Sequence, residues 1–354
     1  MNSYIYTDPM IRLVVSSGLF VLCLAITMLF VVFLMRLNFM LKERRRNRFL
    51  SIWRPLLAAS LDTVPEDLPA VRSGDAVTFL FLWNYYQESL LGEANEKLNE
   101  VARRVGIDRV AIKLLYKKGI RQKLMAISTL GHLEEKAARE RLYEFAESAN
   151  SALSLAAFKA LVQIEKEDAM PVLMPLLSTR TDWSLDMVAS ILKSAPADAL
   201  VKPLGQVALN APGKVQPRLI RFLEATGSAE IRQCISAILH SATRSEVISA
   251  CLHAIAEIGD PRDLELVRQH VSHQSWFVRV QAARALGKIG IHDDEQRLIE
   301  MLHDMAWWVR YRAAQSLAAL PFVSTRRFKE IQGKETNMDV RGILAQVMLE
   351  EGML

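Results

Sequence analysis

The chain has 354 residues, of which 51% are hydrophobic and 23% are charged, and this is the composition of a folded protein with a large core. Its three cysteines are too few for a disulfide framework, which suits a reducing compartment. The net charge of +5 lies wholly in residues 1–48, with seven basic and two acidic side chains, whereas the remainder holds 37 of each sign. The composition therefore gives no support for the basic groove of a nucleic-acid-binding protein, and we expect no nucleic acid partner.

Residues 13–35 carry no charged side chain over 23 consecutive positions, and they follow a short N-terminal tail, residues 1–12. As an α-helix, this stretch spans about 34 Å at 1.5 Å per residue, which is enough for a hydrocarbon core of roughly 30 Å. A cleaved signal peptide would have a shorter apolar core, a small-residue cleavage site after it and its basic residues before it. The sequence therefore predicts a transmembrane helix over residues 13–35.

Basic side chains crowd the segment after the predicted span, residues 36–52, whereas Arg12 before the span is balanced by Asp8. They are Arg36, Lys42, Arg44, Arg45, Arg46 and Arg48, and only Glu43 opposes them. The positive-inside rule places the N-terminal tail outside and everything after residue 36 in the cytoplasm. The same side chains can attract anionic membrane lipid at about 1 kcal/mol per charge, so they are candidates for lipid contact as well as topology signals.

Residues 53–116 are apolar and aromatic-rich but do not share the repeat that follows them. Terminal units of repeat proteins are atypical because they cover the end of the stack, so we expect a divergent helical cap here. Its aromatic residues Trp53, Trp83, Tyr85 and Tyr86 are expected to pack inside this cap. The alternative is that some of them face a membrane partner, because this segment lies nearest the bilayer.

Residues 117–354 repeat an apolar pattern with a period of 31. Steps of 31, with one of 32, connect the anchors Leu130, Leu161, Leu192, Leu223, Ile255, Leu286, Leu317 and Met348. The positions three and four residues before each anchor are also apolar, which makes 24 apolar positions in 24. For a chain that is about half hydrophobic, chance gives this roughly once in ten million.

Each repeat reads as a pair of short amphipathic helices. The offsets of three and four residues place one apolar stripe on a helix that ends near the anchor. A second apolar pair, spaced i, i+4, follows 12 and 16 residues after six of the anchors, as at Leu298 and Leu302. A lone pair of such helices cannot bury its stripes, so neighbouring pairs must stack. The sequence therefore predicts an all-α protein with an α-solenoid of helical hairpins over residues 117–354.

Two of the repeats carry a recognisable family pattern. The segments WFVRVQAARALGKIG (276–290) and WWVRYRAAQSLAAL (307–320) share a Val-Arg pair, a small Ala-Ala step and a Leu anchor. They resemble HEAT repeats, in the short variety found in HEAT-like bacterial proteins. The resemblance is strongest over residues 246–320, and further back to Lys117 only the apolar frame remains. The signatures of tetratricopeptide and ankyrin repeats do not occur.

No catalytic pattern competes with a binding role. The sequence has no His-Glu-x-x-His, Gly-x-Ser-x-Gly or P-loop motif, and none of its seven histidines is followed by Glu. Paired His-Glu motifs hold the metals in the di-iron hydroxylases that are built on HEAT-like repeats, so that resemblance implies no such site here. His270 and His273 are three residues apart but form at most an incomplete metal site. We therefore expect no enzyme activity, metal or cofactor, with a HEAT-like lyase or hydroxylase as the alternative.

Aromatic and basic residues recur at equivalent positions of the repeats. Equivalent positions align along one ridge of a solenoid, and Trp and Arg are enriched where proteins bind. The alternative is structural, because such arginines can tie neighbouring repeats together and the rings can cover the stack. The candidate protein-binding ridge consists of Trp183, Trp276, Phe277, Arg279, Trp307, Trp308, Arg310, Tyr311, Arg312 and Arg341. The column Val278, Val309 and Val340 is expected to be core.

These patterns predict a cytoplasmic scaffold or regulatory subunit that is tethered to a membrane and binds another protein. One N-terminal span followed by HEAT-like repeats with the segment WWVRYRAA also resembles bacterial accessory proteins of exopolysaccharide synthesis and secretion. That resemblance implies an integral membrane partner, a glycosyltransferase or polysaccharide synthase, and a place in the bacterial inner (plasma) membrane. A self-assembling membrane scaffold is a further alternative.

Overall fold

The computed structural model describes residues 9–90, 92–165, 170–195 and 197–353. These residues form α-helices and two short 3₁₀ turns, and no strand occurs among them. The predicted all-α fold is therefore confirmed. Most of the predicted tail, residues 1–8, lies outside the described residues.

The chain divides into two compact units, Met1–Leu133 and Glu134–Leu354, which we call unit 1 and unit 2. Unit 1 contains the helices α1 (Pro9–Ala59), α2 (Ala76–Ser89), α3 (Glu93–Arg104), α4 (Ile107–Leu115) and α5 (Ile120–His132). The first repeat anchor, Leu130, lies on α5. The compact unit therefore extends past the cap that we expected to end at residue 116.

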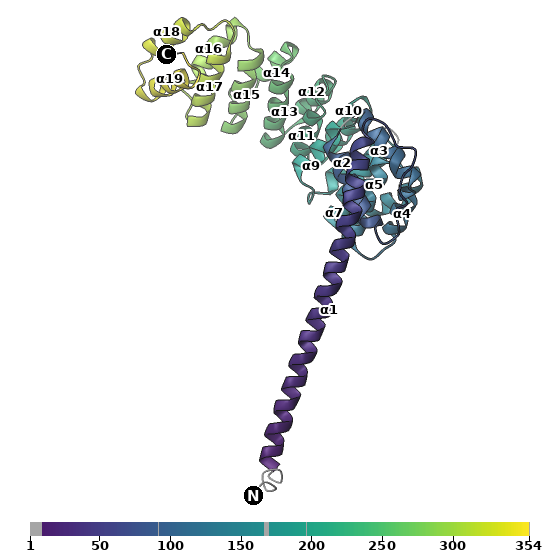
Figure 1. Cartoon of the computed structure of the whole chain (residues 1–354). Helices are drawn as coiled ribbons and strands as arrows, with labels where there is room; N and C mark the ends of the chain where they lie inside the picture. The colour runs from purple at the N-terminus through teal and green to yellow at the C-terminus, as the bar shows by residue number, and fades with distance from the viewer. Residues whose placement is uncertain (1–8, 91, 166–169, 196, 354) are drawn as a thin grey trace. The chain divides into compact units, whose positions relative to one another are not determined.

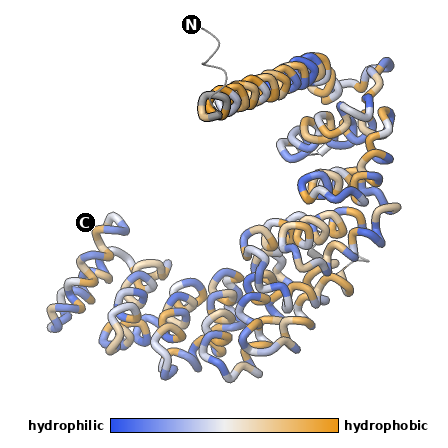
Figure 2. Tube along the Cα trace, turned by 90° about the horizontal axis from the view of Figure 1, so that it is seen from below, coloured by the Kyte–Doolittle hydropathy of each residue, from blue (hydrophilic) through white to orange (hydrophobic). Residues whose placement is uncertain are grey.

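Helix α1 is a single helix that includes both the predicted span and the basic segment after it. Its side chains are exposed along the apolar stretch, and none of its most apolar part is buried. Figure 2 shows hydrophobic residues over most of its length and hydrophilic residues where it approaches the rest of unit 1. By length and composition, α1 is able to cross a membrane.

The end of α1 is held by the aromatic core of unit 1. Trp53 is 1% exposed, and its ring meets that of Phe79 on α2 edge to face, with the centroids 4.7 Å apart. Trp83 is fully buried and donates from Nε1 to the backbone oxygen of Leu98 at 2.9 Å. Two of the four aromatic residues expected in the cap are therefore core, whereas Tyr85 is exposed.

Unit 2 contains the remaining helices, which alternate along the chain between two rows. They are α6 (Arg139–Ala146), α7 (Ser151–Glu165), α8 (Met170–Thr179), α9 (Leu185–Lys193), α10 (Ala197–Asn210), α11 (Gln216–Ala225), α12 (Ile231–Ser241), α13 (Ser245–Ile258), α14 (Leu264–Arg268), α15 (Trp276–Ile289), α16 (His292–Met301), α17 (Trp307–Ala319), α18 (Thr325–Lys334) and α19 (Met338–Glu350). Helices α9, α11, α13, α15, α17 and α19 pack side by side in one row (Figure 1). Helices α8, α10 and α12 likewise form part of the second row. Unit 2 is thus an α-solenoid.

The apolar repeat is the core of this stack. Of its 24 positions, 21 lie in unit 2, and all of these are buried except Ala189 and Ala345, which are partly exposed. The column Val278, Val309 and Val340 is fully buried, as predicted. Because burying a Leu side chain contributes about 1.5–3 kcal/mol, the repeated anchors account for much of the stability of the unit.

Two buried carboxylates link successive repeats. Asp263 and Asp294 are 31 residues apart, and each is fully buried at the start of a second-row helix. Arg232 donates to Asp263 at 2.8 Å, and Arg268 donates to both carboxylate oxygens of Asp294 at 2.9 and 3.0 Å. Each arginine comes from the second-row helix of the preceding repeat, so the pairs fasten neighbouring repeats to each other.

Candidate functional site

Three exposed tryptophans gather at the start of α15 and α17. Trp276 and Trp307 are the first residues of these helices, and Trp308 follows on α17. Their exposed fractions are 47%, 41% and 58%. Because α15 and α17 pack side by side, their first turns lie at one edge of the solenoid. The repeat that aligned these residues in the sequence therefore brings them together in space.

Ring contacts hold the tryptophans of α17 in place. Trp307 stacks on Tyr311 with a centroid distance of 5.0 Å and an interplanar angle of 9°. Trp308 meets Trp307 edge to face at 4.8 Å. The Tyr311 hydroxyl donates to Glu350 on α19 at 2.7 Å, and this bond, followed by burial, raises the pKa of Tyr311. The aromatic side chains thus form an ordered surface rather than a set of mobile rings.

Met305 completes this surface. It lies in the turn just before α17 and is 97% exposed, the most of any large apolar residue among those described. We call Trp276, Phe277, Met305, Trp307, Trp308 and Tyr311 the aromatic edge. The sequence analysis missed Met305, because the equivalent position one repeat earlier is Gln274 and no apolar residue recurs there.

The arginines of the predicted ridge have a different role. Arg279 binds both carboxylate oxygens of Asp304 at 2.6 and 2.7 Å, and it also donates to the carbonyl oxygen of His273. Arg310 donates in the same way to the carbonyl oxygens of Asp304 and Met305 at 2.9 and 3.2 Å. Burial raises the pKa of Asp304, but the bonds from Arg279 and the backbone N–H of Ala306, together with the nearby positive charges, outweigh it, so the pKa lies below its usual value. These two arginines therefore fasten the turns that carry the aromatic edge.

The other predicted ridge residues are spread over different environments. Trp183 is only 2% exposed, because its ring packs against Phe158 at 5.1 Å, so it does not belong to the exposed surface that we expected. Arg312 is partly buried, which lowers its pKa, and the nearby Arg284 lowers it further. Arg341 is exposed on α19. Of the predicted protein-binding ridge, the candidate binding surface is therefore the aromatic edge, held in place by Arg279 and Arg310.

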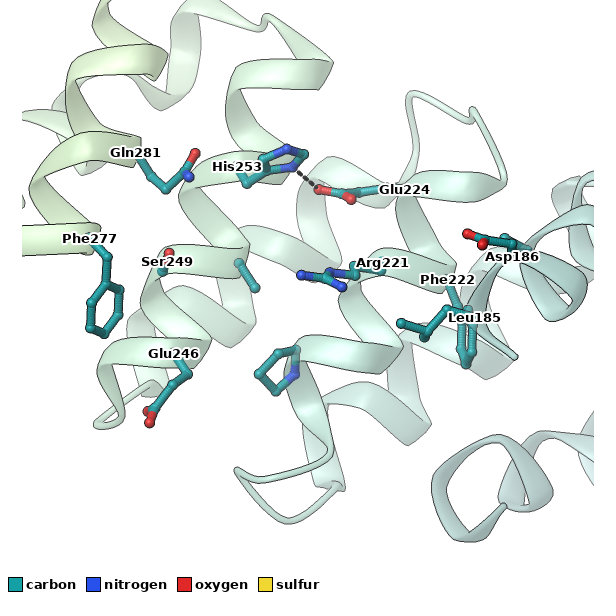
Figure 3. A pocket seen from close by; sticks show the side chains of 13 residues that line it. Leu185, Asp186, Arg221, Phe222, Glu224, Glu246, Ser249, His253, Phe277 and Gln281 are labelled. Atoms are coloured by element: carbon teal, nitrogen blue, oxygen red, sulfur yellow. Dashed lines mark hydrogen bonds and ion pairs between the residues drawn. The ribbon is translucent and has the colours of Figure 1, made fainter. Parts of the chain in front are cut away.

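A groove of about 580 Å³ crosses the first row of helices beside the aromatic edge. It is lined by residues from α9 to α15, and Phe277 forms one end of it. The ring centroid of Phe277 lies 5.9 Å from that of Trp276. Inside the groove, His253 lies 2.9 Å from a carboxylate oxygen of Glu224 (Figure 3). Its charged lining is mainly acidic, with Asp186, Glu224 and Glu246 against Arg221, and these side chains offer polar contacts to a partner chain.

The two neighbouring histidines have local partners. The rings of His270 and His273 stack at 6.3 Å, with Nδ1 of His270 2.8 Å from the carbonyl oxygen of Leu266. Nδ1 of His273 accepts from the backbone N–H of Ser275 at 3.0 Å. Across the described ranges, no group of three or more His, Cys, Asp or Glu side chains is placed to hold a metal ion.

The basic side chains after the predicted span are all exposed on α1. Two of them have acidic partners, since Arg46 donates to Glu43 at 2.9 Å, and Nε and Nη2 of Arg45 donate to Asp75 at 2.8 and 2.9 Å. That pair connects α1 to the start of α2 within unit 1.

Comparison with known proteins identifies the repeats. The profile of HEAT repeats matches residues 112–192 and 235–318, so the predicted HEAT-like character is confirmed. No curated protein matches the chain. Among solved structures, the karyopherin Kap121p bound to the SUMO protease Ulp1p is similar over 79% of this chain and 38% of its own, at 12% identity and a TM-score of 0.49. An engineered protein is similar over 83% of this chain and 97% of its own, at 18% identity and a TM-score of 0.32. The complex of CpcE and CpcF of phycocyanin lyase from Nostoc sp. PCC7120 is similar over 82% of this chain and 98% of its own, at 17% identity and a TM-score of 0.25.

Proposed function

We propose that this chain is a membrane-tethered scaffold that binds another protein through the aromatic edge of its HEAT-repeat solenoid. The observation that carries the proposal is the exposed group of Trp276, Trp307, Trp308 and Met305. Large apolar side chains gathered at one place on a soluble surface mark an interaction site, and Trp is the residue most enriched among binding hot spots. Helix α1 supplies the tether, with the solenoid on the cytoplasmic side.

The rigidity of the edge supports this role. Arg279 and Arg310 fix the turns, and Tyr311 fixes the ring of Trp307, so little side-chain freedom is lost when a partner covers these residues. The groove that ends at Phe277 provides polar contacts next to this apolar centre. A desolvated aromatic centre with a polar surround is the usual arrangement of a protein interface.

We propose as partner an integral membrane protein of the same bilayer, a glycosyltransferase or polysaccharide synthase of an exopolysaccharide complex. The choice of this enzyme class rests on the resemblance of the chain to bacterial accessory proteins of such complexes. The tether favours a membrane partner, because it confines the solenoid to the volume next to the membrane and raises the effective concentration there.

The test is co-purification from membranes in mild detergent, with the bound proteins identified by mass spectrometry. Replacing Trp307 and Trp308 by Ala should reduce partner recovery at least tenfold, because hot-spot tryptophans contribute about 2 kcal/mol or more each. The matched control replaces Met187 and Leu209 by Ala, since their exposed fractions of 57% and 43% resemble those of the two tryptophans. Undiminished recovery with the double tryptophan variant would refute the proposal.

Two further outcomes separate the alternatives. If only other copies of this chain are recovered, the protein is a self-assembling scaffold. If the Trp307 and Trp308 variant loses its helical circular dichroism, the pair belongs to the core instead. Because both rings are about half exposed, we expect the fold to survive the substitution.

A further inference from the structure

A second groove, of about 460 Å³, lies within unit 1 where α1 joins the helical body. Three helices form its walls, each through side chains spaced four residues apart on one face. They are Arg46, Leu50 and Arg54 of α1, Val77, Phe81 and Leu82 with Thr78 of α2, and Arg121, Gln122 and Met125 of α5. The groove therefore runs along α1 rather than across it.

The charge of this groove is one-sided. Three arginines line it and no acidic side chain does. Arg46 is paired with Glu43 one turn earlier at 2.9 Å, but both side chains are more than one third exposed, so that pair is weak. Arg54 and Arg121 are exposed, and Phe81, which is 60% exposed, supplies an apolar wall beside them. The groove thus presents apolar surface together with unneutralised positive charge.

The distance of the groove from the membrane favours a protein over a lipid as its occupant. The run of exposed apolar side chains on α1 ends at Leu41. At 1.5 Å per residue, Arg46 lies about 7.5 Å and Arg54 about 20 Å beyond that point. The headgroup layer is only about 5–8 Å deep on each side of the hydrocarbon. A lipid headgroup therefore reaches the near end of the groove at most, and a hydrocarbon boundary at Met35 would leave the groove higher still.

We propose that this groove docks the cytoplasmic extension of a transmembrane helix of the partner, an amphipathic helix that carries acidic residues next to its apolar stripe. A helix that leaves the bilayer beside α1 would run along the groove. Its apolar side chains would pack at Leu50, Val77 and Phe81, in the way that amphipathic helices fill grooves through anchors at i, i+4 and i+7. Its carboxylates would pair with Arg54 and Arg121. The inference rests on the membrane tether of the proposed function.

The experiment is site-specific photo-crosslinking in membranes of the host, with the full chain carrying p-benzoylphenylalanine in place of Phe81. We expect a cross-link to an integral membrane protein, at a peptide within about 20 residues of the cytoplasmic end of one of its spans and bearing Asp or Glu four residues apart. The matched control carries the same probe in place of Tyr116, which is similarly exposed but lies outside the groove, and it should not give this product.

Charge reversal tests the chemistry of the site. Arg54→Glu with Arg121→Glu should reduce the cross-link at least tenfold, whereas Arg72→Glu, an exposed arginine of unit 1 outside the groove, should not. Reversing the acidic residues of the cross-linked helix to Arg should then restore the product. Circular dichroism of the double variant shows whether its fold is intact.

Several outcomes would overturn the inference. These are no cross-link at Phe81, a cross-link to lipid, to another copy of this chain or to a soluble protein, and a yield that charge reversal leaves unchanged. The aromatic edge is not altered in any of these variants. Failure here with intact co-purification through Trp307 and Trp308 would therefore reject the groove alone and leave the proposed function standing.

Discussion

Replacing Asp294 by Asn tests whether the buried carboxylates hold the repeats together. Asp294 is fully buried and accepts hydrogen bonds from Arg268, from Arg297 at 3.1 Å and from the backbone N–H of Ile291 at 3.0 Å. Asparagine keeps the shape of the side chain and one acceptor oxygen, but it removes the negative charge. The substitution therefore leaves two guanidinium groups without their common counter-ion.

The structure sets the size of the expected effect. Breaking a buried ion pair costs about 3–5 kcal/mol when the remaining charge stays buried. Arg268 and Arg297 are 20% and 39% exposed, so water recovers part of their solvation, and we expect a loss of about 2–4 kcal/mol. Unit 2 has 354 − 133 = 221 residues, and in this size range 1 kcal/mol corresponds to roughly 2–4 °C. A loss near 3 kcal/mol thus predicts a melting temperature lower by roughly 6–12 °C.

Thermal unfolding of the full chain in detergent, followed by far-ultraviolet circular dichroism, measures this shift. Hydrogen exchange shows where the protein is loosened, because repeats contact only their neighbours. Protection should fall first in α14 and α16, which carry Arg268 and Asp294, and in α15 and α17, which pack against α16. Asp293→Asn is the matched control, since the neighbouring carboxylate is exposed and should shift the melting temperature by no more than about 1 °C. Equal effects of the two substitutions would refute the claim that the buried charge couples the repeats.

Three other changes have outcomes that follow from named contacts. Gly287→Ala should destabilise unit 2 by about 1–3 kcal/mol, because the new Cβ would lie 2.7 Å from the Cβ of Ser316, whereas Gly333→Ala, with open space around it, should be neutral or stabilising in the same denaturation assay. Burial raises the pKa of Asp294, but Arg268 and the other hydrogen-bond donors together lower it more, so the folded pKa lies below the unfolded value of about 3.9. The ionised Asp294 side chain therefore stabilises the fold above the unfolded pKa, and this stabilisation is lost as the pH falls through the folded pKa. Melting temperatures measured from pH 7 to pH 3 should therefore fall mainly below pH 4, less so in Asp294→Asn, and a midpoint near pH 6 would contradict this. Burial, with a smaller effect of a nearby carboxylate, raises the pKa of the Cys251 thiol to about 12, so iodoacetamide at pH 8 should alkylate it only after unfolding, as peptide mass spectrometry would show.

The candidate site was only partly visible in the sequence. The period of 31 aligned Trp276 with Trp307, and the structure brings both to one edge because repeat-equivalent residues occupy equivalent places. The repeat also aligned Trp183 with Phe277 and Trp308, but Trp183 is buried against Phe158. Whether an aligned ring is exposed depends on the turn and helix next to it, and that environment differs between repeats even where the spacing does not.

What the sequence determined by itself was local. The paired helices follow from apolar spacings of three and four residues, which helical pitch sets, and the HEAT pattern follows from their recurrence every 31 residues. The membrane span of α1 follows from a charge-free run that is long enough for the thickness of a bilayer. The tertiary structure alone decided which charges are used inside the fold. Asp304 pairs with Arg279, 25 residues away, and Asp294 pairs with Arg268, 26 residues away. Arg54 and Arg121 line one groove although they lie on helices that are far apart in the sequence. Such pairings depend on how helices dock in space, which no spacing along the chain encodes.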